Sequence, residues 1–128
     1  MIEAGGGVVV NLGSWIARLG LPVGSLYSAS KGAMETLTRA WASEFGPSGV
    51  RVNAVSPGVI RPPGLDPSVE FRGEALMAST PVGRAGDPGA IAAAVVYLAS
   101  DEAWFTHGTV LDVDGGRSGV AVSGARAV

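Results

Sequence analysis

Three residues near the start of the chain are of types that carry proton-transfer chemistry: Ser14, Tyr27 and Lys31. Lys31 is the only lysine, and arginines supply every other basic side chain. On a helix, Tyr27 and Lys31 lie on one face, one turn apart. An ammonium beside a phenol stabilises phenolate, so we expect a tyrosine that exchanges protons near neutral pH. Tyr27 would act as general acid or base, with Ser14 hydrogen-bonded to the substrate oxygen.

The tyrosine–lysine spacing alone has little specificity. Most such pairs are ordinary exposed helix residues, and a serine after a strand usually only caps a turn. The surroundings make the pattern informative, because Asn11 and Gly13 precede Ser14, and Arg-Val-Asn-Ala-Val-Ser-Pro-Gly occupies residues 51–58. We therefore turn to the elements that must bring these residues together.

Three short β-branched runs, each bounded by glycine or proline, predict strands at residues 8–12, 50–55 and 109–113. We expect the first strand to be buried on both faces, because it is a continuous apolar run. Residues 61–81 contain four prolines and two glycines and predict a long irregular segment, with a short helix near residues 69–78.

Two long helices are predicted between these strands. Good helix formers without proline predict a helix over residues 26–45, which Gly46-Pro47 ends. Asp87 as the N-cap and Pro88 at the first helical position predict a second helix that runs to about Ser100.

Strands that alternate with helices indicate the α/β class, with right-handed crossovers and a parallel sheet. In such sheets the chemistry collects at the carboxyl ends of the strands. Ser14 follows the first strand, Pro57 and Gly58 follow the second, and Tyr27 and Lys31 open the helix between them. The candidate residues are therefore expected at one edge of the sheet.

Taken together, these segments resemble the carboxyl-terminal half of a short-chain dehydrogenase/reductase, with a Rossmann-type doubly wound parallel sheet. The most specific match is Tyr27-Ser28-Ala29-Ser30-Lys31. The resemblance covers nearly everything from Gly5 to Gly116, through residues 7–14, 27–31, 49–58, 81–84, 98–101 and 113–116.

The resemblance implies roles for particular residues. Ser14, Tyr27 and Lys31 would be catalytic, and the substrate would be an alcohol or a carbonyl compound. The cofactor would be NAD or NADP, held by Tyr27 and Lys31 and by the backbone around the nicotinamide carboxamide. That last set is Pro57, Gly58, Val59 and Ile60. Relatives usually pair through the helix that holds Tyr27, so the resemblance also implies a homo-oligomer.

Two departures from the family pattern concern cofactor binding. Pro62 stands where the family commonly has a threonine, and proline offers neither a hydroxyl nor an N–H. The sequence also contains no glycine-rich strand–turn–helix phosphate site. Residues 1–118 are therefore predicted to form a partial domain without the dinucleotide phosphate-binding half, and residues 119–128 a flexible tail.

Composition excludes several other functions. The formal net charge is −2, which argues against a nucleic-acid or anionic-membrane partner. The chain has no cysteine, which excludes disulfides and zinc–thiolate sites and suits the cytoplasm. Asp112 and Asp114 alternate on a strand without further carboxylates, so we expect no metal site. No signal peptide and no membrane-spanning run is visible.

The missing half leaves alternatives open. Residues 8–10 would form an unpaired apolar edge, which favours association. Met1 is expected to be an internal methionine of a longer protein, in which case this chain alone is an inactive fragment, at most an association module. A third alternative is a remnant that does not fold. Trp15, which follows Ser14, is either a core aromatic or a wall of the substrate pocket.

Overall fold

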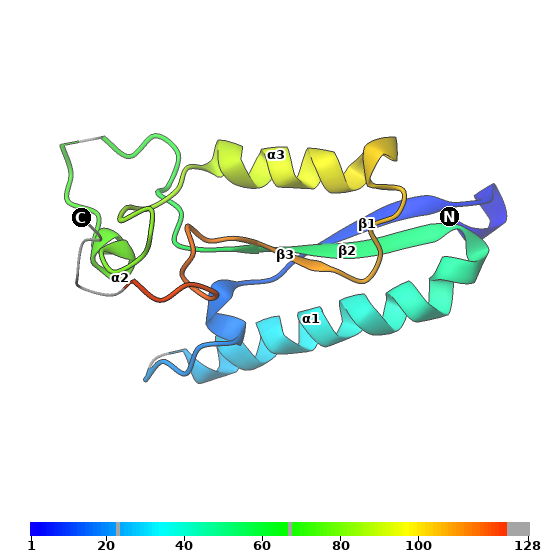
Figure 1. Cartoon of the computed structure of the whole chain (residues 1–128), viewed down its shortest axis with the longest axis horizontal. Coiled ribbons are helices and arrows are strands. Elements are labelled where there is room, and N and C mark those ends of the chain that lie inside the picture. Colours follow the sequence, from blue (N-terminus) through cyan, green and yellow to red (C-terminus); the bar gives the residue numbers. More distant parts are fainter. Residues whose placement is uncertain (23, 67, 123–128) are drawn as a thin grey trace.

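The computed structural model describes residues 1–22, 24–66 and 68–122. It contains three parallel strands, β1 (Gly7–Leu12), β2 (Val50–Pro57) and β3 (Val110–Val113), paired in the order β1-β2-β3. Their carboxyl ends point to the same end of the molecule (Figure 1). The predicted parallel α/β sheet is therefore confirmed, with strand boundaries that differ by one or two residues.

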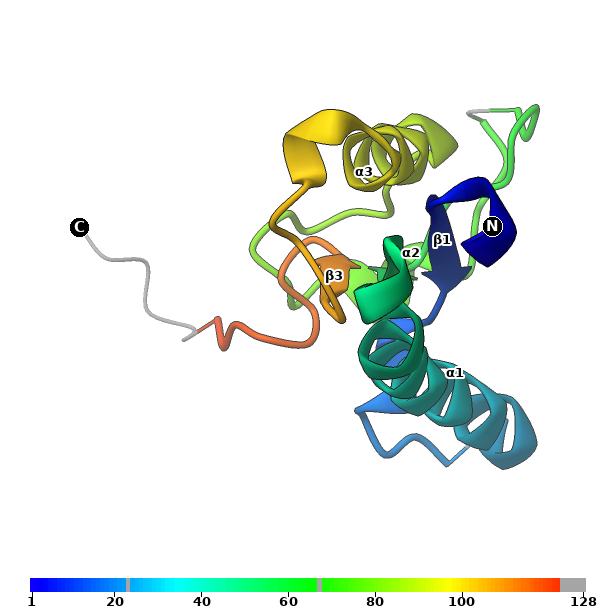
Figure 2. The same ribbon diagram turned by 90° about the vertical axis from the view of Figure 1, so that its right-hand side faces the viewer.

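Helices cover both faces of this sheet. Helix α1 (Ser25–Phe45) lies on one face and α3 (Pro88–Ala99) on the other (Figure 2). A short helix, α2 (Glu74–Met77), lies beyond the carboxyl ends of the strands (Figure 1). The long predicted helices are both present, and the short helix covers only residues 74–77, in the second half of the predicted 69–78 segment.

The central strand β2 carries the core. Val52, Ala54 and Val55 are fully shielded from solvent, because a helix covers each face of the middle strand. Asn53 is equally buried and donates from Nδ2 to the Thr106 carbonyl at 2.8 Å, while its Oδ1 accepts from the Thr109 amide. This amide side chain therefore fixes the loop that leads into β3, which satisfies a buried polar group.

The strand β1 differs from the prediction of burial on both faces. Its side chains are only partly buried, and that of Leu12 is half exposed. The reason is its position, because β1 is at the edge of the described sheet and pairs only with β2. The predicted unpaired apolar edge is thus present in the structure.

Helix α3 is fixed at both ends by side chains. Asp87 accepts a hydrogen bond from the Gly89 amide at 2.8 Å, as predicted for an N-cap followed by Pro88. At the other end, the guanidinium of Arg51 on β2 donates to the carbonyl of Leu98 in the last turn, and to those of Ser100 and Ala103 beyond it. The bond to Leu98 satisfies one of the carbonyls that the end of a helix leaves without an intrahelical partner.

The irregular segment after β2 is held by one arginine. Arg61 donates to the carbonyls of Asp66 and Val69, and its guanidinium lies 3.4 Å from Glu74. The other oxygen of Glu74 accepts from the Ala85 amide at 2.7 Å. The segment is therefore tied, through Glu74, to the residues just before α3. Of the predicted tail, residues 123–128 lie outside the described residues.

A pair of glycine substitutions tests this packing. A Cβ at Gly58 would lie 2.6 Å from the Cα of Asp114, so Gly58→Ala forces two backbone segments apart and should destabilise the chain by about 1–3 kcal/mol. Gly32 in α1 faces open space, so Gly32→Ala should stabilise the chain by about 0.5–1 kcal/mol. Urea unfolding of both variants measures the difference. Equal stabilities for the two variants would contradict the close contact between the ends of β2 and β3.

Candidate active site

Lys31 joins the helix α1 to the end of β1. Its ammonium donates to the carbonyl of Leu12, the last residue of β1, at 2.9 Å. The same nitrogen lies 5.6 Å from the centroid of the Tyr27 ring, one turn earlier on the helix. The predicted pair is therefore formed, and it lies at the carboxyl end of the first strand.

Ser14 is two residues beyond Leu12. It is 7% exposed and is the N-cap of a 3-10 turn, η2 (Trp15–Ala17), which begins the long loop to α1. The Ala17 amide donates to the Ser14 carbonyl at 3.0 Å, so the turn fixes the serine backbone. Among the described residues the Ser14 hydroxyl has no hydrogen-bond partner.

The hydrogen-bond donors of Tyr27 and Lys31 at this edge are mostly without partners among the described residues. Tyr27 is 52% exposed, and within the described part of the chain its phenol has no hydrogen-bond partner. Lys31 uses one of its three ammonium donors on Leu12. An exposed phenol and free ammonium donors are what the hydroxyls of a ribose require, so these residues fit the nicotinamide ribose of NAD or NADP.

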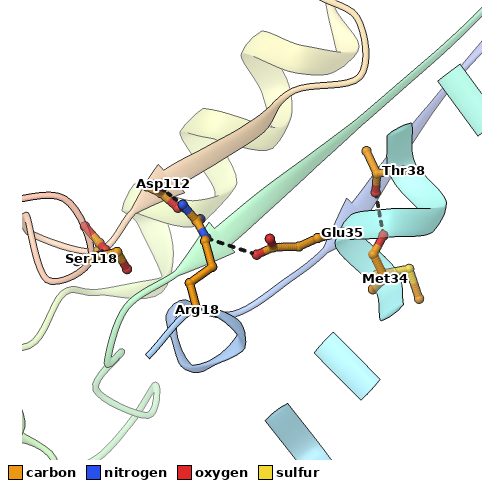
Figure 3. A network of polar contacts seen from close by, with 7 residues as sticks. Arg18, Met34, Glu35, Thr38, Asp112 and Ser118 are labelled. Atoms are coloured by element: carbon orange, nitrogen blue, oxygen red, sulfur yellow. Dashed lines mark hydrogen bonds and ion pairs between the residues drawn. The ribbon is translucent and has the colours of Figure 1, made fainter. Parts of the chain in front are cut away.

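The first part of α1 faces the sheet with polar side chains. Glu35 is 5% exposed and Thr38 is fully shielded, one turn and two turns after Lys31. The Thr38 hydroxyl donates to the Met34 carbonyl (Figure 3). It also accepts a hydrogen bond from Asn11 Nδ2 on β1 at 2.9 Å. The sequence prediction of this helix did not identify this row, because it used helix formers and the absence of proline rather than the positions of the polar side chains. The signal was the i, i+4, i+7 spacing of Lys31, Glu35 and Thr38.

Arg18, which the sequence did not indicate as a site residue, links Glu35 on α1 to the third strand. Its guanidinium forms a two-bond contact with the carboxylate of Asp112 on β3, one bond of which measures 2.9 Å. Its Nε lies 3.4 Å from Glu35 Oε1 on α1 (Figure 3). The hydrogen bonds to Asp112 hold the pKa of Arg18 above its ordinary value.

Residues 57–60 leave the end of β2 beside the end of β3. The Gly58 amide donates to the Val113 carbonyl at 3.0 Å, and the Gly86 amide donates to the Val59 carbonyl. Ile60 forms an isolated parallel bridge with Gly86. A mostly apolar cavity of about 160 Å³ lies here, and residues 58–60 form part of its wall.

Asp114 orders the turn after β3. Its carboxylate accepts from the amides of Gly116 at 2.9 Å and Ser118 at 2.7 Å. Burial raises the pKa of Asp114, but the hydrogen bonds from Ser118, Gly116 and Arg117 outweigh it and leave this pKa below its ordinary value. Arg117, held by this turn, lies over the ring of Trp15, with its guanidinium carbon 5.1 Å from the centroid. Trp15 is thus a buried aromatic next to Ser14.

Comparison with known proteins agrees with this geometry. The family described as Enoyl-(Acyl carrier protein) reductase matches residues 1–118. The chain is 41% identical to 2-(S)-hydroxypropyl-CoM dehydrogenase 3 of Xanthobacter autotrophicus, over 94% of this chain and 49% of that protein. A solved structure described as a short chain dehydrogenase/reductase family protein superposes with a TM-score of 0.82 and 44% identity, over 94% of this chain and 49% of that one.

A gluconate 5-dehydrogenase from Burkholderia cenocepacia, solved with NADP and tartrate, superposes with a TM-score of 0.83 at 30% identity, over 94% of this chain and 48% of that one. The chain therefore belongs to the short-chain dehydrogenase/reductase family and corresponds to its carboxyl-terminal half. It spans about half the length of the curated relatives it matches. Within the described ranges, none of the helices has the length and apolar character needed to cross a membrane.

The turn after β3 generates a pH prediction. A carboxylate with a lowered folded pKa contributes stability that is present above its unfolded pKa and is lost as pH falls through the folded pKa. Asp114→Asn keeps the shape but removes the charge, so the variant should be less stable than the parent at neutral pH. The difference should shrink as the solution is acidified below the ordinary range of aspartate. Thermal unfolding of both proteins over a pH series measures this difference in stability. A difference that stays constant with pH would contradict the lowered pKa of Asp114.

Proposed function

We propose that this chain supplies the proton-transfer half of an NAD(P)-dependent oxidoreductase that acts on an alcohol or carbonyl substrate. The observation that carries the proposal is the position of the Lys31 ammonium, between the Tyr27 ring and the carboxyl end of β1. Ser14, whose hydroxyl has no hydrogen-bond partner within the described part of the chain, lies two residues beyond the end of that strand. No other described set of residues combines an exposed phenol, an ammonium and a buried serine in this way.

In this proposal each residue has a defined role. The Ser14 hydroxyl donates to the substrate oxygen, where negative charge develops during carbonyl reduction. The Tyr27 phenol gives its proton to that oxygen, or takes one from an alcohol in the reverse direction. Lys31 holds the ribose of the cofactor and places a positive charge beside the phenol. A nicotinamide cofactor, when bound, supplies or accepts the hydride.

The remaining contacts would come from residues 57–60 and the segment after them. The backbone of Pro57, Gly58, Val59 and Ile60 would face the nicotinamide. This backbone is held in place by the sheet, because Gly58 packs against Asp114 too closely to carry a Cβ. Residues 61–81 would cover the substrate, with Arg61 and Glu74 holding that segment in place. The donors for the pyrophosphate and the adenosine would come from a dinucleotide-binding half that the matched region does not include.

Substitution of the proposed proton donor tests the reaction. In the protein purified at the length it has in its own cells, Tyr27→Phe should lower kcat by about 10²–10⁴-fold, because the proton has no donor in the transition state. Tyr97→Phe is the matched control, since Tyr97 lies on α3 with its hydroxyl 3.4 Å from Thr106. Turnover of a carbonyl substrate, followed at the NADH or NADPH absorbance, measures both. Equal rates for the two variants would reject the assignment of Tyr27.

A second candidate function is association through α1. Leu26 is 86% and Leu37 38% exposed, and they lie eleven residues apart, about three turns, on one face of the helix. A second copy of the chain that covered this face would bury both side chains. The same contact would make the oxidoreductase a homo-oligomer.

The association is tested by polar substitution on this face. Leu26→Gln together with Leu37→Gln should weaken self-association at least about tenfold, since each buried leucine contributes roughly 1.5–3 kcal/mol. The control is Phe105→Ser, which removes an 85% exposed aromatic from the turn after α3. Sedimentation velocity across a concentration series measures both. A larger effect of Phe105→Ser would place the contact at the turn after α3 instead.

A further inference from the structure

We infer that Arg18 is a positioning residue that sets Ser14 against the Tyr27–Lys31 face of α1. The inference rests on the proposed function, since it assigns a role in that reaction. Arg18 is the C-cap of the turn whose N-cap is Ser14. Because the Ala17 amide bonds to the Ser14 carbonyl and the Arg18 amide lies 3.4 Å from the Trp15 carbonyl, the two ends of this turn move together.

The guanidinium holds the turn from two directions. It forms two parallel bonds with Asp112 on β3, and its Nε faces Glu35 on α1 (Figure 3). A planar guanidinium can make the two-bond contact and still present its third nitrogen, whereas a lysine ammonium cannot. One side chain therefore connects the serine turn, the third strand and the helix that carries Tyr27.

The contact between Arg18 and Glu35 aligns α1 with the turn that holds Ser14. It follows Lys31 by four residues and so lies on the same face of α1, one turn further along. Lys31 is tied to Leu12 and Glu35 to Arg18, so two successive turns of the helix are fixed to residues on either side of Ser14. A rotation or shift of α1 relative to Ser14 would break one of these contacts.

Loss of Arg18 also has a cost in stability, which must be separated from positioning. Glu35 is 5% exposed, and in the described ranges Oε1 has no hydrogen-bond partner and Arg18 is its only ion-pair partner. Arg18→Met leaves a buried carboxylate without compensation, which is strongly destabilising. The double variant Arg18→Met, Glu35→Gln removes that charge as well, so it should recover stability without restoring the position of Ser14.

The experiment compares this double variant with Arg51→Met. Arg51 is the matched control, because it makes three hydrogen bonds on the α3 side of the sheet and none near Ser14. Trp15, next to Ser14, supplies a signal that does not depend on turnover. With 5-fluorotryptophan incorporated, the ¹⁹F resonance of Trp15 should shift or broaden in Arg18→Met and in the double variant, and stay in place in Arg51→Met.

Turnover in the protein at its natural length gives the second measurement. The double variant should lower kcat by about 10–100-fold, with the KM for the cofactor unchanged, because the serine is misplaced and the ribose contacts remain. The variant Arg18→Lys should not restore kcat, because an ammonium cannot contact Asp112 and Glu35 at the same time as a guanidinium does. The inference is overturned if the double variant keeps the Trp15 resonance, or keeps kcat within about twofold of the parent. If the parent itself shows no turnover, the proposed function fails, and the Trp15 resonance still decides the role of Arg18.

Discussion

The hydrogen bond from Lys31 to the Leu12 carbonyl is the contact on which the candidate site depends. It connects the first half of α1 to the last residue of β1, at the edge of the sheet where the carboxyl ends of three parallel strands meet. Around it, Thr38 binds Asn11 before the strand ends, and Arg18 binds Glu35 after it. A helix that would ordinarily pack through apolar residues is here fixed to the sheet by polar ones.

This arrangement is stable because β2 carries the hydrophobic core. Val52, Ala54 and Val55 are fully buried, while the buried Asn53 uses its amide to order the approach to β3. Polar groups buried in a core are tolerated when they have partners, and most of those described here do. The end of β2 then meets the end of β3 at Gly58 and Asp114, so the backbone that would face a nicotinamide is held by the sheet itself.

Much of the fold could be predicted from the sequence, because its signals are local. Asp87-Pro88 defined the start of α3, and Gly46-Pro47 the end of α1, through capping and proline chemistry. The short strand runs indicated a parallel sheet. The pairing of Tyr27 with Lys31 followed from helical spacing alone, and the structure places the two together.

The network around Arg18 could not be predicted in this way. Asp112 is 94 residues away from Arg18, and their contact depends on how β3 pairs with β2. The burial of Glu35 likewise depends on the orientation of α1 on the sheet, which its apolar residues did not reveal. The partial exposure of β1 has the same origin, because a continuous apolar run does not show whether a neighbouring strand is present.

The most direct test of the central claim is a structure of the protein, at its natural length, with a nicotinamide cofactor bound. The proposal predicts the ribose hydroxyls within hydrogen-bond distance of the Tyr27 phenol and the Lys31 ammonium, and the nicotinamide against residues 57–60. A cofactor bound with its nicotinamide away from Tyr27, and without any contact to Lys31, would contradict it.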